Sequence, residues 1–147
     1  MAETHLVILC VDDESAVLHP LEIMLKRQGF HVVTAQDGNS AIELFQQIKF
    51  DAVILDYSMP GMSGGEVARI LRRENQSIPI ILHTGYKELD DPLLVNVTCT
   101  LPKGSLSFLV TKLHDLLHVE PVPTAPGQPE PEAEPKSPAI ARSAHVA

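Results

Sequence analysis

The sequence contains no tryptophan, only two cysteines and only 11 lysines and arginines among 147 residues. Because 19 aspartates and glutamates outnumber these cations, the formal net charge is -8. Direct binding of nucleic acid depends on clustered lysine and arginine, so this charge balance argues against a nucleic-acid partner. Cys10 and Cys99 stand in apolar segments, where we expect reduced, packed side chains rather than a disulfide or a metal pair.

Long apolar runs are also missing. No stretch approaches the roughly 20 residues that a membrane-spanning helix needs, and the first residues lack a basic segment before their short apolar run. We therefore expect a cytoplasmic protein with no membrane contact. A chain of 147 residues, 44% of them hydrophobic, has room for one domain with a core of its own.

The composition changes after Val119. Residues 120–147 hold seven of the twelve prolines and no aromatic residue. Such a segment cannot bury enough apolar surface to offset its chain entropy. We therefore predict a folded domain over residues 1–119 and a disordered tail, rich in proline, alanine and glutamate, over residues 120–147.

Short β-branched runs alternate with longer segments of helical period in the first part of the chain, a pattern typical of βαβ units. The strand candidates are Leu6–Val11, His31–Thr34, Ala52–Leu55, Ile80–His83 and Val97–Leu101. Most are continuous apolar runs, as expected for strands covered by helices on both faces. We predict an α/β protein with a flavodoxin-like, doubly wound, five-stranded parallel sheet of order 2-1-3-4-5 and about five helices.

The predicted helices differ in how clearly the sequence defines them. The first should stop at Gly29, and it either begins late or bends because Pro20 lies inside it. The second, third and fifth are expected over residues 37–48, from residue 63 or 64, and over residues 105–118. The fourth, within residues 87–95, contains Pro92 and is expected to be short or irregular.

Polar residues gather where the predicted strands end. Asp12 and Asp13 follow the first strand, Asp56 follows the third, Thr84 the fourth and Lys103 the fifth. In doubly wound sheets the ligand binds beyond the carboxyl ends of the strands, so these side chains should converge. Taken singly, each has a simpler explanation, such as a helix cap or a solvated lysine. Their coincidence at successive strand ends favours a functional site.

Carboxylates packed this closely would repel one another unless a cation joined them. A divalent metal with oxygen ligands explains the cluster most simply, and Mg²⁺ suits a site that also receives a phosphate oxygen. One carboxylate can then attack phosphorus and form an acyl phosphate. Lys103 would stabilise the developing negative charge, and Thr84 would donate a hydrogen bond to the phosphoryl group.

Four segments resemble the receiver domain of two-component response regulators. They are VDDE at 11–14, LDYSMPGMSG at 55–64, HTG at 83–85 and LPKG at 101–104. The resemblance covers roughly residues 5–118. It implies that Asp56 is the phosphoacceptor, that Asp12 and Asp13 hold Mg²⁺, and that the backbone carbonyl of Ser58 completes the metal shell. It also implies that Thr84 moves onto the phosphoryl group beside Lys103.

The resemblance implies partners as well. In this family the phosphoryl donor is a histidine kinase or a histidine phosphotransfer protein, and output passes through a downstream protein. No output domain is recognisable in the sequence, so we expect a single-domain response regulator, monomeric or weakly dimeric. Such a protein is not an enzyme in the usual sense, because it catalyses only its own phosphorylation and dephosphorylation.

Two positions depart from the family pattern. Gly104 stands where receivers usually carry proline, and Thr100 stands where many carry an aromatic residue that swings inward on phosphorylation. The stretch between Thr84 and Lys103 is also shorter than expected. These departures affect the usual readout rather than the phosphoryl chemistry.

Three alternatives stay open. The first is a pseudo-receiver, a binding module that keeps the fold without a phosphorylation switch. A flavodoxin-like cofactor binder is disfavoured because Asp12 and Asp13 would repel a flavin phosphate. A phosphohydrolase with an aspartyl intermediate is disfavoured because Tyr57 and Ser58 supply no second acid after Asp56.

Overall fold

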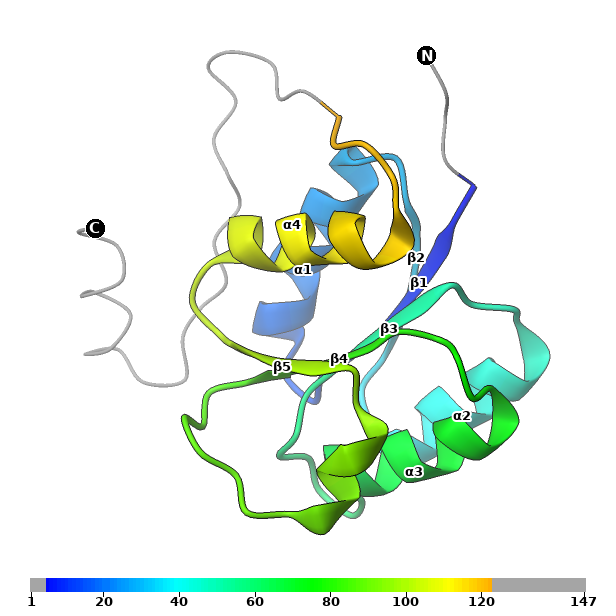
Figure 1. Ribbon diagram of the computed structural model, residues 1–147, viewed down its shortest axis with the longest axis vertical. Coiled ribbons are helices and arrows are strands. Elements are labelled where there is room, and N and C mark those ends of the chain that lie inside the picture. Colours follow the sequence, from blue (N-terminus) through cyan, green and yellow to red (C-terminus); the bar gives the residue numbers. More distant parts are fainter. Residues whose placement is uncertain (1–4, 123–147) are drawn as a thin grey trace.

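A computed structural model describes residues 5–122, and this part of the chain forms a parallel sheet between two layers of helices (Figure 1). The strands are β1 (Val7–Val11), β2 (His31–Ala35), β3 (Ala52–Leu55), β4 (Ile80–Thr84) and β5 (Cys99–Pro102). Their order is β2-β1-β3-β4-β5, and every neighbouring pair is parallel. This architecture confirms the predicted flavodoxin-like α/β fold and its strand order.

Helices α1 (Ser15–Arg27) and α4 (Leu106–Leu117) cover one face of the sheet, and α2 (Gly38–Gln47) and α3 (Gly64–Glu74) cover the other (Figure 1). The connection from β4 to β5 contains only η1, a 3₁₀ helix over Pro92–Asn96. Four α-helices and one short 3₁₀ helix therefore stand in the described residues where about five helices were expected. The helix expected between β4 and β5 is the short η1, as the sequence predicted.

Helix α1 begins at Ser15 and continues through Pro20, so the late start, the first of the two expected alternatives, is wrong. Proline at this place removes one intrahelical hydrogen bond, which would run to the carbonyl of Ala16. Apolar side chains on both sides of it, Leu18 and Leu21, are buried in the core against the sheet and keep the segment helical. Gly29 has a φ of 90°, which confirms the predicted left-handed stop after this helix.

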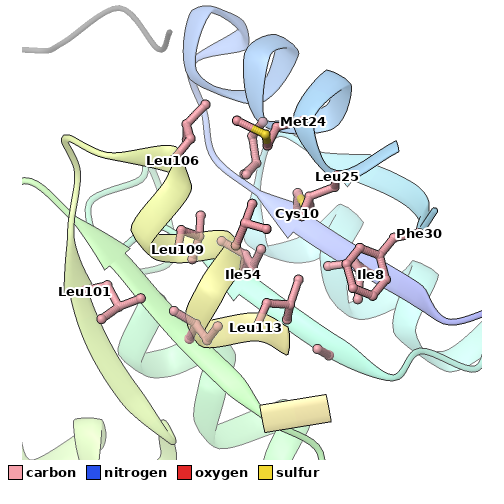
Figure 2. Packing of buried hydrophobic residues seen from close by; sticks show 14 of the residues in the cluster. Ile8, Cys10, Met24, Leu25, Phe30, Ile54, Leu101, Leu106, Leu109 and Leu113 are labelled. Carbon is pink, nitrogen blue, oxygen red and sulfur yellow. The ribbon is translucent and has the colours of Figure 1, made fainter. Parts of the chain in front are cut away.

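Each face of the sheet has its own apolar core. The core under α1 and α4, seen in Figure 2, joins β1, β3 and β4 to side chains of both helices. The core under α2 and α3 also reaches η1 through Leu94, and includes Val97, which directly follows η1. Because β1, β3 and β4 are buried on both faces, they form a rigid base for the residues that follow them.

The predicted boundary after residue 119 falls just before the end of the described part. The amide of Val122 donates to Oε1 of Gln28 at 2.9 Å, and Nε2 of Gln28 donates to the carbonyl of Val122 at 3.3 Å. Residues 123–147, most of the predicted tail, lie outside the described residues. Among residues 5–122, no helix is long and apolar enough to cross a bilayer.

Candidate functional site

The two central strands carry the acidic residues of the site. Asp12 directly follows β1, and its amide donates to the carbonyl of Ala35 at 3.1 Å. Asp56 directly follows β3, and its amide donates to the carbonyl of Val11 at 2.9 Å. These bonds continue the pairing of the sheet by one residue, so the backbone of both aspartates is fixed. Only 3% of Asp12 and 2% of Asp56 is exposed.

Lys103 lies between the two buried carboxylates. Its Nζ is 2.6 Å from Oδ2 of Asp12 and 3.1 Å from Oδ1 of Asp56. The amide of Lys103 donates to the carbonyl of Thr84 at 2.8 Å, which ties the residue to the end of β4. The structure therefore brings Lys103 into the acidic pocket, as the positions at the strand ends predicted.

One lysine does not fully compensate two buried acids. Burial raises the pKa of the Asp12 carboxyl above its usual value, and the neighbouring Asp56 raises it further. The hydrogen bond from Lys103 and the one from the amide of Glu14 to Oδ1 of Asp12 act in the opposite direction. The negative charge of the pocket is therefore only partly compensated, and a further cation there would be stabilised.

Asp13 completes an acidic triad. Oxygen atoms of Asp12, Asp13 and Asp56 lie within 4.8 Å of one another. The Oδ1 atom of Asp13 is shielded from solvent and accepts no hydrogen bond from the described residues. A shielded carboxylate oxygen without a donor is costly unless a cation faces it. Three convergent carboxylates of this kind fit a hard divalent cation such as Mg²⁺.

Two of the predicted residues have less direct support. Thr84 is 1% exposed at the end of β4, but its Oγ1 accepts a hydrogen bond from the amide of Tyr86 at 3.1 Å. Its hydroxyl therefore holds the following loop in this state. Ser58 is exposed in the loop after β3, and a metal contact from its carbonyl stays a prediction.

One contact next to the phosphoacceptor candidate does not follow from the sequence pattern. The hydroxyl of Tyr57 donates to Oδ2 of Asp91 at 2.7 Å, across the loop that leads to η1. Asp91 also caps η1, because its Oδ1 accepts from the amide of Leu93 at 2.9 Å. Aspartate followed by proline at the first helical position is a typical helix start, so the cap of η1 by Asp91 could have been predicted from the sequence.

A protein-family model identifies the family of this chain. The model of the response regulator receiver domain matches residues 8–96, more than half of the chain. The chain belongs to this family, the receiver module of two-component signalling systems. Receiver domains are signalling modules rather than conventional enzymes.

Solved receiver structures share the fold. The response regulator TrrA from Thermotoga maritima, crystallised in complex with Mg²⁺ and BeF, is 34% identical with a TM-score of 0.73. The match covers 76% of this chain and 99% of TrrA. The chemotaxis protein CheY4 from Vibrio cholerae is 27% identical, with a TM-score of 0.70 over 78% of this chain and all of that chain.

Curated relatives are longer than the matched region. The cell cycle response regulator CtrA from Brucella abortus is 36% identical over 84 residues, which cover 57% of this chain. The match spans 36% of that relative. The similarity to CtrA therefore concerns the receiver part and not the activity of the whole relative.

Proposed function

We propose that the protein is a single-domain response regulator in which Asp56 accepts a phosphoryl group from a phosphohistidine donor. The observation that carries the proposal is the pocket in which Lys103 bridges Asp12 and Asp56 and Asp13 lies alongside. Both oxygens of Asp12 already accept hydrogen bonds, from the amide of Glu14 and from Lys103. We assign the nucleophile to Asp56 because its place after β3, in the run LDYSMPGMSG at 55–64, resembles the phosphoacceptor position of receiver domains.

The transfer would form one bond and break another. A carboxylate oxygen of Asp56 attacks phosphorus and forms an acyl phosphate, while the bond from phosphorus to the donor nitrogen breaks. The electron pair of that bond stays on the donor imidazole. Lys103 already contacts Oδ1 of Asp56, so its ammonium can stabilise the charge of the transferred group. Thr84 would turn its hydroxyl towards a phosphoryl oxygen.

Mg²⁺ is the proposed cofactor, held by Asp12, Asp13 and Asp56 with the backbone carbonyl of Ser58. When bound, it would neutralise the carboxylates and draw charge from the phosphoryl oxygens. The shielded Oδ1 of Asp13 and the Mg²⁺ complex of the relative TrrA support this assignment.

A histidine kinase or a histidine phosphotransfer protein is the proposed donor. TrrA, 34% identical, has also been crystallised with the histidine kinase ThkA, in a structure that matches 76% of this chain and 98% of TrrA with a TM-score of 0.71. Output through an unidentified protein target, a monomeric or weakly dimeric state, a cytoplasmic location and self-catalysed dephosphorylation stay predictions. The charge of -8 supports an output without direct nucleic-acid binding.

Phosphorylation by a small donor tests the proposal. The full chain is mixed with acetyl phosphate and Mg²⁺, and intact mass is measured over time. We expect a phosphoryl mass gain in the wild type and in the control Asp115→Asn, which changes an exposed aspartate on α4. Asp56→Asn and a sample with chelated metal should show no gain. A gain in Asp56→Asn would assign the acceptor elsewhere, and no gain in the wild type would favour the pseudo-receiver.

A further inference from the structure

Tyr57 contacts three segments around the proposed phosphoryl site, one through its backbone and two through its side chain. Its backbone directly follows Asp56, and its carbonyl accepts from the amide of Gly64 at 2.7 Å. Its ring meets the ring of Tyr86 edge-on, with centroids 6.4 Å apart. Its hydroxyl donates to Oδ2 of Asp91 at 2.7 Å. One residue thus contacts α3, the loop after Thr84 and the start of η1.

Asp91 divides its two oxygens between the site and η1. Oδ1 accepts from the amide of Leu93 at 2.9 Å, and the backbone carbonyl of Asp91 accepts from the amide of Leu94 at 3.0 Å. Oδ2 accepts from Tyr57. Because η1 has only five residues, this cap is a large share of its hydrogen bonding. Loss of the Tyr57 contact would free one oxygen of the residue that caps η1, and would loosen η1 through that cap.

The first turn of α3 fills the space between the two segments. A Cβ atom on Gly64 would lie 2.4 Å from the carbonyl oxygen of Asp56. A Cβ atom on Gly65 would lie 2.8 Å from Oδ2 of Asp91 and 3.2 Å from Cβ of Leu93. Glycine allows the acceptor loop and η1 to pack against the same turn. A shift of the acceptor loop against this turn would therefore also displace η1.

Rotation of the Thr84 side chain would disturb the contact between Tyr86 and Tyr57. Oγ1 of Thr84 accepts from the amide of Tyr86, and a side-chain rotation that carried Oγ1 away from this amide towards a phosphoryl group would break that bond. The amide of Tyr86 then needs a new acceptor, and the loop that carries its ring must adjust. That ring packs against Tyr57.

We propose that the hydrogen bond between Tyr57 and Asp91 is a latch that couples the phosphoryl site to η1. In the free protein the latch holds η1 against α3, and it opens when Thr84 turns to the phosphoryl group. Opening changes the surface around Val95, the side chain of η1 that is 85% exposed. This inference rests on the proposed phosphorylation of Asp56 and assigns its regulatory readout to η1.

Backbone NMR of the full chain tests the latch, with beryllofluoride and Mg²⁺ as the phosphoryl mimic. In the wild type we expect the amide signals of residues 93–96 to shift when the mimic binds. In Tyr57→Phe the amide signals of residues 93–96 should lie near their mimic-bound positions before the mimic is added. They should then change little when it binds. A hydrogen bond to a charged acceptor corresponds to a shift of about tenfold or more in the closed-to-open ratio.

Tyr86→Phe is the matched control, because it removes a hydroxyl from the neighbouring ring and leaves the latch intact. It should respond like the wild type. Asp91→Asn provides a second way to weaken the latch if Tyr57→Phe loses the signals of the folded sheet. Responses of residues 93–96 that are equal in the wild type and in the folded latch variant would overturn the latch alone. Absence of any phosphoryl mass gain in the wild type would overturn the proposed function and the latch together.

Discussion

The acidic side of the site and its far edge are held by different kinds of contact. Asp12 and Asp56 extend the central strands, and hydrogen bonds between backbone groups of the sheet fix them. Residues 85–98 contain no strand and only the 3₁₀ helix η1, which side chains hold in place. The guanidinium of Arg72 donates to the carbonyl of Asn96, and Oγ1 of Thr98 accepts from the amide of Ile80.

This difference matches what each side has to do. Phosphoryl transfer needs carboxylates at fixed positions, which buried central strands provide. A readout segment needs a low cost of local movement, and a short 3₁₀ helix held by side chains has that property. Changes on the acidic side should therefore lower stability and phosphoryl uptake, whereas changes at the edge should alter the response of η1.

The largest effect is expected from Lys103→Met, which leaves two buried carboxylates without their ammonium. Removing one partner of such a buried pair costs about 3 kcal/mol of the free energy of unfolding at neutral pH without metal. Denaturant unfolding in the presence of a chelator measures it. Lys87→Met, which changes an exposed lysine, is the control and should stay within about 0.5 kcal/mol of the wild type.

The loss in Lys103→Met should depend on pH. The pKa of Asp12 is already raised, by burial and by Asp56, and removal of Lys103 raises it further. A group with a folded pKa above its unfolded value stabilises the fold below the unfolded pKa and loses this effect as pH rises through the folded pKa. The deficit should therefore be smaller in acid than at neutral pH. A deficit that grows on acidification would contradict this electrostatic account.

A paired glycine experiment compares the two sides directly. Gly64→Ala places a methyl group 2.4 Å from the carbonyl of Asp56, so the acceptor loop must shift. Overpacking of this kind costs about 2 to 3 kcal/mol. Gly85→Ala, at the start of residues 85–98, meets nothing within 4 Å and should cost less than about 0.5 kcal/mol. Equal losses in the two variants would mean that the edge is packed as tightly as the centre.

Arg72→Met tests how the edge is held. The guanidinium donates to the carbonyls of Asn96, Ile78 and Asn75, so its removal leaves carbonyl groups on both sides of β4 without donors. We expect a loss of about 2 kcal/mol by denaturant unfolding and faster hydrogen exchange in η1. Arg73→Met, at an exposed position in the same helix, should change neither quantity.

The smallest expected effect is a shift in the titration of Tyr57. The bond that its hydroxyl donates to Asp91 raises the pKa of Tyr57, because ionisation would place two negative charges together. The bond is therefore intact below the usual tyrosine pKa and is lost as pH rises through the raised value. Asp91→Asn should lower the pKa of Tyr57 in an NMR titration, with Tyr86 as internal reference. An unchanged pKa would show that the bond is absent in solution.

Several features followed from the sequence because they depend on local patterns. Continuous apolar runs predicted β1, β3 and β4, and the polar residues after them predicted the acidic pocket. Pro20 was misleading, because burial of the α1 face outweighs one lost hydrogen bond. Pro92 was read only as a helix breaker, although Asp91 before it is a typical cap.

The sequence by itself determined the α/β class and the acids at the strand ends, because hydrophobic period and strand ends are local properties of the chain. The strand order followed from the topology common to doubly wound sheets. Only the tertiary structure decided which atoms Lys103 contacts: its Nζ lies between Oδ2 of Asp12, 91 residues away, and Oδ1 of Asp56. It also decided that Tyr57 bonds to Asp91 across 34 residues. Such contacts depend on how loops from different strands meet in space, and no local period encodes that geometry.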